Sequence, residues 1–139
     1  MPLQIERKQP QGLNVRMQQG KPAYSHVVTV NGPGKTVYVA GQLARDADGS
    51  IVGPDDMRAQ LEQTFKNLDL CLKEAGAGWA DVVKTNTFVT DYEAFAKCSD
   101  IRMRYFGVAS PTSTTIQISR LAQPEAMVEI ELVAVVADQ

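Results

Sequence analysis

The chain has 139 residues, of which 44% are hydrophobic and 22% charged, and its formal net charge at pH 7 is -2. This length is sufficient for one domain with its own hydrophobic core. The composition is typical of a globular protein and excludes a mainly disordered chain. Because the charge is nearly balanced, the basic surface that nucleic-acid binding requires is missing. We therefore predict a single domain over residues 1–139 and no nucleic-acid partner.

The beginning of the chain, MPLQIERKQPQG, has charged residues at positions 6–8 and lacks the apolar run of a secretory signal. No apolar stretch is long enough for a transmembrane helix, so we expect no membrane partner and a cytoplasmic location. In that setting Cys71 and Cys98 are predicted to be reduced thiols. His26 is the only histidine and is far from both cysteines in the sequence, so no metal site is expected. No phosphate-binding loop motif occurs, and we expect no cofactor.

Two runs rich in β-branched residues, 24–30 and 36–40, stand near the start of the chain. They are separated by the sequence Asn-Gly-Pro-Gly at positions 31–34. Proline fixes φ and glycine accepts a positive φ, so this sequence is typical of a turn. The pattern predicts two strands joined as a β-hairpin.

The pattern becomes helical after Asp55, where apolar residues recur every three or four positions and so lie on one stripe of a helix. Gly76 and Gly78 are predicted to end this helix. The residues of the stripe are Met57, Leu61, Phe65, Leu68, Leu72 and Ala75.

A strand is predicted over residues 81–90, which are rich in Val, Thr and Phe. Thr90 and Glu93 have the spacing of a capping box and predict the start of a second helix. Gly107 and Pro111 are expected to close that helix. Its apolar stripe consists of Phe95, Cys98, Ile101, Tyr105 and Phe106.

Two more strands are predicted over residues 114–121 and 127–136, joined by a turn that contains Pro124. The complete order is ββαβαββ, which predicts an α/β protein of the two-layer α+β type, with both helices on one face of a mixed sheet. Both alternating sets of residues in the last strand include apolar side chains. Because the helices cover only one face, this pattern predicts an oligomer.

Four segments carry a resemblance to the RidA family, also called YjgF or L-PSP. They are AGQL (40–43), DVVKTNTFVTDYEAF (81–95), ISRL (118–121) and VEIELVAV (128–135). No single segment is specific, but their order and spacing extend through nearly the whole chain. The resemblance implies the chorismate-mutase-like fold, a homotrimer around a barrel built from three sheets, and small-molecule pockets between neighbouring subunits. The best-known activity of the family is hydrolysis of reactive imines and enamines, which releases ammonia and a 2-oxo acid.

The resemblance also assigns site residues. Glu129, in VEIEL, matches the glutamate that orients and deprotonates the attacking water, which makes it the candidate catalytic residue. Tyr24 and Gly41 fall at pocket positions, where the ring would form a wall and the glycine backbone would bind the ligand. Ser113 stands where deaminating members carry an arginine that clamps the substrate carboxylate. Thr115 stands where such members often have cysteine.

The same residues also fit purely structural roles. Glu129 has the pattern of a solvent-facing strand residue, Ser113 and Thr115 are of types that favour strands, and Tyr24 is of a type that often serves packing. A carboxylate bound at a serine would lose a charge-assisted pair worth roughly 1.5–3 kcal/mol. Two hypotheses follow: a hydrolase that acts on a C=N bond of a small metabolite, and a non-catalytic member that binds or senses a small ligand. The acidic charge disfavours ribonuclease activity.

Overall fold

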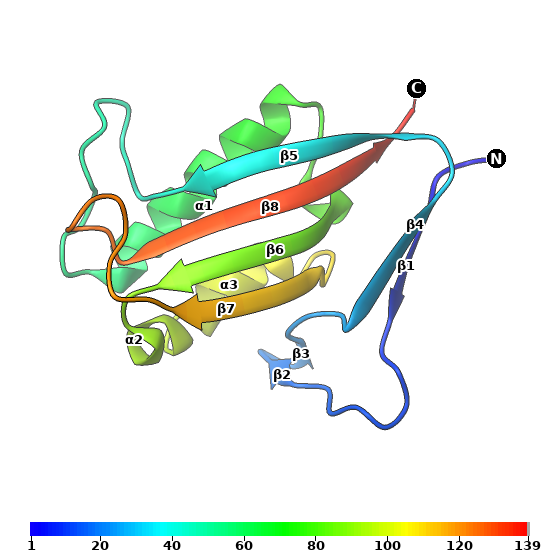
Figure 1. Ribbon diagram of the computed structural model, residues 1–139, viewed down its shortest axis with the longest axis horizontal. Helices are drawn as coiled ribbons and strands as arrows, with labels where there is room; N and C mark the ends of the chain where they lie inside the picture. The colour runs from blue at the N-terminus through cyan, green and yellow to red at the C-terminus, as the bar shows by residue number, and fades with distance from the viewer. Residues whose placement is uncertain (139) are drawn as a thin grey trace.

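The computed structural model describes residues 1–138 of the chain. Its main sheet has the strand order β5-β8-β6-β7, which runs from top to bottom in Figure 1. Strands β5 (Gly34–Gln42) and β6 (Val82–Val89) both pair antiparallel with β8 (Val128–Ala137). Strand β7 (Thr112–Gln117) pairs parallel with β6 and forms one edge of the sheet. The predicted mixed sheet is thus confirmed.

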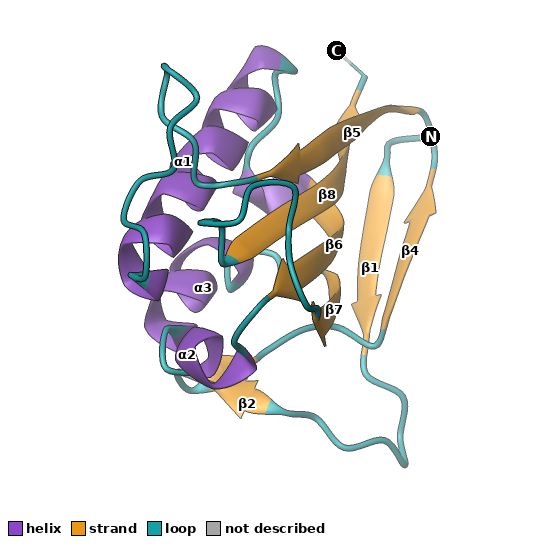
Figure 2. Cartoon of the chain, turned by 60° about the vertical axis from the view of Figure 1, so that its left-hand side comes forward, coloured by secondary structure: helices purple, strands orange, loops and turns teal. Residues whose placement is uncertain are grey.

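Helices cover one face of this sheet, as Figure 2 shows. They are α1 (Met57–Glu74), α2 (Tyr92–Ala96) and α3 (Ser99–Phe106), and a short 3-10 helix (Trp79–Asp81) precedes β6. Helix α1 begins where predicted, because the side chain of Asp56 accepts a hydrogen bond from the Ala59 amide at 3.1 Å and so caps the helix. The predicted two-layer arrangement with helices on one face is confirmed. None of the helices within residues 1–138 is long and apolar enough to cross a membrane.

The second predicted helix differs from the structure in two ways. It is divided into α2 and α3, because the backbone of Cys98 (φ -106°, ψ 25°) leaves the helical region. The predicted capping box of Thr90 and Glu93 is wrong. The Thr90 amide still donates to the Met127 carbonyl and extends the sheet pairing, so the cap falls one residue later, at Asp91.

The predicted hairpin is also wrong, although both of its strands exist. Strand β4 (Val27–Asn31) pairs antiparallel with the N-terminal strand β1 (Gln4–Lys8) in a separate two-stranded sheet. Gly32 has a φ of 98°, and a Cβ there would lie 2.6 Å from the Pro2 carbonyl oxygen, so the chain turns closely around the N-terminal segment. Figure 2 shows this β1–β4 ribbon on the side of the main sheet away from the helices. A further two-stranded ribbon joins β2 (Met17–Gln18) to β3 (Lys21–Pro22).

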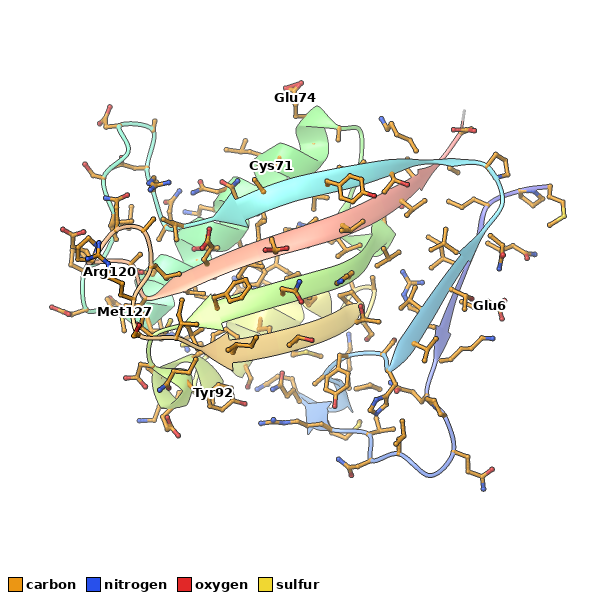
Figure 3. The ribbon with its side chains drawn as sticks, viewed as in Figure 1. Glu6, Cys71, Glu74, Tyr92, Arg120 and Met127 are labelled. Atoms are coloured by element: carbon orange, nitrogen blue, oxygen red, sulfur yellow. The ribbon has the colours of Figure 1, made fainter. Side chains whose placement is uncertain are left out.

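The hydrophobic core lies between the helices and the sheet. Gln60 of α1 is also buried there, and its side-chain amide bonds to the Gly53 and Glu125 carbonyls and to the Met127 amide, which holds the start of α1 to the end of the sheet. The two cysteines are free thiols, and Figure 3 shows Cys71 on the side of α1 near β5. The fully buried side chains of the core include Leu61, Phe65, Leu68, Leu72, Val82, Val89, Val128 and Ile130.

The face of the main sheet that no helix covers also carries apolar side chains. We call it the open face. Tyr38 is 80% exposed there and Ile116 is 47% exposed, while Val133 on β8 is half-buried. The prediction that both faces of the last strand are apolar is therefore confirmed.

Candidate functional site

The predicted site residues fall into two groups on opposite faces of the main sheet. Side chains of directly paired residues point to the same face. Ser113 pairs with Thr85, which in turn pairs with the buried Leu132, so Ser113 faces the helices. Glu129 pairs with Phe88 and alternates with the buried core residues of β8, so it faces the open side. Within one chain, the sheet therefore separates Ser113 from Glu129.

Glu129 and Gly41 form the group on the open face. Gly41 lies at an irregularity in the pairing of β5 with β8, between Val39 and Gln42. A Cβ built on Gly41 would overlap the carboxylate of Glu129, which is half-buried. Only glycine leaves room for the carboxylate against the backbone of β5. The structure therefore brings together two residues that the sequence assigned to one site.

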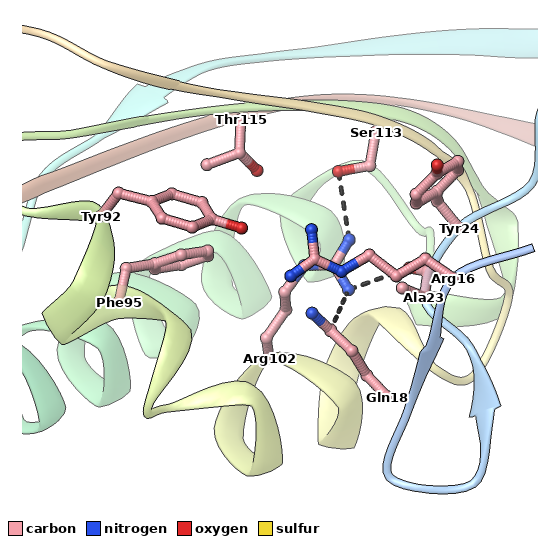
Figure 4. Close-up of a pocket in the computed structure, with 9 residues that line it drawn as sticks. All are labelled: Arg16, Gln18, Ala23, Tyr24, Tyr92, Phe95, Arg102, Ser113 and Thr115. Carbon is pink, nitrogen blue, oxygen red and sulfur yellow. Dashed lines mark hydrogen bonds between the residues drawn. The ribbon is translucent and has the colours of Figure 1, made fainter.

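Tyr24, Ser113 and Thr115 form the second group, around a pocket of about 160 Å³. Figure 4 shows the residues that line it, among them Arg16 and Arg102. The pocket lies beside edge strand β7, on its helix-facing side. Figure 3 shows Tyr92, another lining residue, at the start of α2 below β7.

Arg102 of α3 is the most deeply buried charged residue of the pocket, with only 4% of its surface exposed. Its Nη2 donates to the Ser113 hydroxyl at 3.1 Å, and its Nη1 donates to the Gln18 side-chain oxygen at 3.1 Å and to the Ala23 carbonyl at 2.9 Å. Within residues 1–138 no carboxylate forms an ion pair with it. Burial of the guanidinium, and next the positive charge of Arg16, lower the pKa of Arg102 to about 10.

Sequence reasoning missed Arg102, although a signal for it exists. It lies four residues after Cys98 and four before Phe106, on the apolar stripe of the predicted helix, and a charged residue on a buried stripe is an informative exception. Arg16 belongs to the N-terminal segment, which has no periodic pattern, and nothing in the sequence indicates its position. Ser113, assigned from the resemblance as the residue that replaces an arginine, is the residue that Arg102 contacts.

The polar groups around the pocket are mainly hydrogen-bond donors. Two guanidinium groups face it together with the hydroxyl groups of Tyr92, Ser113 and Thr115. In Figure 4 the Tyr92 hydroxyl points toward the guanidinium groups of Arg16 and Arg102. Among the residues that the structure describes, no cluster of His, Cys, Asp and Glu could hold a metal ion.

Comparisons with known proteins agree with the fold and cover most of the chain. Residues 18–136 match the family described as endoribonuclease L-PSP. A RutC family protein of Synechocystis is 36% identical over 114 residues, which are 81% of this chain and 85% of the relative. The 2-iminobutanoate/2-iminopropanoate deaminase of Rattus norvegicus is 33% identical over 113 residues, which are 81% of this chain and 80% of that protein.

Solved structures give the same result. The crystal structure of YyfB, a Rid family protein from Yersinia pestis, superposes with a TM-score of 0.79 at 32% identity, covering 94% of this chain and 97% of that chain. Rv2704 of Mycobacterium tuberculosis, from the YjgF/YER057c/UK114 family, superposes with a TM-score of 0.64 at 31% identity, covering 82% and 87%. The family match over residues 18–136 includes helices α1, α2 and α3, strands β5, β6 and β7, and all but the last residue of β8. The chain therefore belongs to the RidA/YjgF/L-PSP family and has its chorismate-mutase-like α+β fold.

Proposed function

We propose that this protein is a hydrolase that acts on the C=N bond of a small imine or enamine, in a cleft shared by two subunits of a homotrimer. One subunit supplies Glu129 and Gly41. Its neighbour supplies the pocket lined by Tyr24, Ser113 and Thr115. The observation that carries the proposal is the separation of these two groups on opposite faces of one sheet.

That separation favours a shared site for a physical reason. A water held by Glu129 must reach a substrate atom at about 3 Å, and within one chain the sheet stands between the carboxylate and the pocket. A second copy removes this obstacle if its open face lies near the pocket edge of the first. The apolar residues of the open face, Tyr38 and Ile116 among them, are suited to such a contact because a monomer leaves them in water.

The chemistry needs one water and no cofactor. Glu129 accepts a proton from the water, whose oxygen adds to the imine carbon while the imine nitrogen takes up a proton. The amino nitrogen of the resulting carbinolamine then gains the proton held by Glu129, the C–N bond breaks and ammonia leaves, while the hydroxyl group gives its proton back to the carboxylate as the C=O bond forms. The balance is one imine and one water consumed for one carbonyl compound and one ammonia. Hydroxyl groups of the pocket hold the substrate in line with the water.

Related proteins support this choice over ribonuclease activity. Several relatives at 30–33% identity are named as 2-iminobutanoate/2-iminopropanoate deaminases. The family description refers to an endoribonuclease. However, a formal charge of -2 offers little attraction to a polyanion.

The test is ammonia release from freshly generated 2-iminopropanoate, measured with the wild-type protein and without protein. The wild type is expected to accelerate the release and to form pyruvate in equal amount. Replacement of Thr115 by phenylalanine should fill much of the pocket and lower the rate by about 10²-fold, because substrate misplaced by about 1 Å loses that much.

Thr115→Ser is the matched control, because it keeps the hydroxyl and removes only a methyl group. It should retain activity within about threefold, so a loss in Thr115→Phe alone is due to bulk in the pocket. A wild-type rate equal to that without protein would contradict the hydrolase proposal and favour a member that only binds its ligand.

A further inference from the structure

A groove on the helical layer, which we call the outer groove, has no part in the proposed function. It has a volume of about 510 Å³, which is in the range of pockets that hold one small molecule. It is formed by α1, the 3-10 helix and α3, and these helices lie on the side of the sheet away from the open face (Figure 2). A contact between subunits through the open face therefore leaves the outer groove in contact with solvent. Its lining residues are Lys66, Asp69, Leu70, Trp79, Arg104 and Tyr105.

Two aromatic rings line the outer groove, and contacts within the protein hold both of them in place. The Tyr105 ring stacks on the buried Phe65 ring, with 4.5 Å between centres and 6° between planes. The Trp79 ring lies 5.0 Å from the Tyr105 ring between centres, and its indole N–H donates to Asp69 at 2.9 Å. Both rings are only half-buried. Because they are already fixed, they lose little freedom when an aromatic ligand packs on them.

The apolar part of the outer groove is small and is bordered by charged pairs. Leu70, beside the two rings, is 67% exposed. Arg104 pairs with Glu62 at 3.0 Å, and Lys73 pairs with Asp69 at 2.7 Å. A stable protein interface covers about 800 Å² on each partner and has few charges at its centre. An apolar surface interrupted by ion pairs on both helices is better suited to a single ring than to a protein partner.

The charge that remains available in the outer groove is positive. Both oxygens of Asp69 have partners, because Oδ2 pairs with Lys73 and Oδ1 accepts the hydrogen bond from Trp79. Lys66 forms no ion pair within residues 1–138. It is one helical turn before Leu70, so the two side chains share one face of α1. Its ammonium group is a point charge on a flexible stem and can reach an anion at the edge of the groove.

We propose that the outer groove binds a small aromatic carboxylate, with its ring against Trp79 and Tyr105 and its carboxylate beside Lys66. The ring covers apolar surface that is otherwise in water, and the carboxylate pairs with the available cation. Arg104 adds a second positive group, because its hydrogen bonds to Glu62 use only Nη1. The inference is independent of the proposed function, since no residue of the outer groove lines the pocket beside β7.

Trp79 is the only tryptophan of the chain, so its fluorescence reports directly on the outer groove. The protein is titrated with phenylacetate, with the neutral phenylacetamide and with the saturated analogue cyclohexylacetate, at constant ionic strength. Phenylacetate should change the Trp79 emission in a saturable way. It should bind about two- to fivefold more tightly than phenylacetamide and about two- to tenfold more tightly than cyclohexylacetate. Free N-acetyltryptophanamide is the control for collisional quenching.

Variants at exposed positions assign the binding to the groove. Lys66→Gln should weaken phenylacetate binding by about two- to fivefold and leave phenylacetamide binding unchanged, because only the charged ligand pairs with the ammonium group. Leu70→Ala should weaken the binding of both ligands. Lys97→Gln is the matched control for the charge, because Lys97 is an exposed lysine at the end of α2 that does not line the groove. It should bind phenylacetate as the wild type does.

Thr115→Phe separates this site from the pocket beside β7. It fills that pocket and should keep the wild-type affinity for phenylacetate at the outer groove, so the inference and the proposed function fail in different experiments. A change in Trp79 emission no larger than that of free N-acetyltryptophanamide would overturn the inference. Equal affinities for phenylacetate and phenylacetamide would do so as well. Loss of the emission change in Thr115→Phe would also overturn it, because the ligand would then lie in the other pocket.

Discussion

Replacement of Glu129 by glutamine is expected to lower the rate of imine hydrolysis by about 10²- to 10⁴-fold. The amide has nearly the shape of the carboxylate, so it should still fit against Gly41, but it cannot accept a proton from water. Ammonia release from 2-iminopropanoate measures the loss. Sedimentation should show the same assembly as for the wild type, because the substitution changes no apolar contact.

Glu131→Gln is the matched control for this experiment. Glu131 is two residues further along β8, on the same open face, and is exposed. Its side chain has no hydrogen bond or ion pair within the described part of the chain. We expect the activity of Glu131→Gln to stay within about twofold of the wild-type activity. Equal losses in the two variants would mean that charge on the open face, and not a proton acceptor at Glu129, supports the reaction.

Replacement of Phe65 by alanine is expected to lower the free energy of unfolding by about 3–5 kcal/mol. Phe65 has no exposed surface, and its ring stacks on Tyr105 at 4.5 Å between centres and meets Phe106 edge-on at 5.1 Å. The truncation removes these aromatic contacts and leaves a cavity between α1 and α3. Urea unfolding monitored by circular dichroism measures the change.

Leu70→Ala provides the comparison on the same helix. Leu70 is 67% exposed, so its truncation should change the free energy of unfolding by about 0.5 kcal/mol or less. A loss below about 1 kcal/mol in Phe65→Ala would show that the aromatic cluster is not the centre of the core. Dissociation of an oligomer on unfolding would make the midpoint depend on protein concentration, so both variants are compared at one concentration.

Periodicity in the sequence was sufficient to predict the central elements of the fold. Helix α1 and strands β6 and β8 bury one regular set of side chains, and that regularity is visible in the residues themselves. The partner of β4 was not predictable in this way. The turn at Gly32 is compatible with a hairpin or with a departure from the sheet, and the choice depends on β1, whose exposed residues carry no alternating pattern.

The candidate site was predictable only in part, for a similar reason. Glu129 and Gly41 were assigned through local segments that resemble the family, and the structure places them in contact. The residue type at position 113 indicated an uncharged pocket, whereas the structure supplies Arg102 from a helix that precedes β7. The contact between Arg102 of the helix and Ser113 of the strand, eleven positions later, forms only when α3 packs beside β7. The residue types of the strand alone do not indicate it.

The measurement that tests the shared site most directly is complementation between two inactive variants. Glu129→Gln and Thr115→Phe are coexpressed with different tags, and trimers that contain both are isolated by two successive affinity steps. If each site takes Glu129 from one subunit and the pocket from its neighbour, every mixed trimer has one intact site of three, so about one third of wild-type ammonia release should return. Mixed trimers no more active than the separate variants would contradict a site shared between subunits.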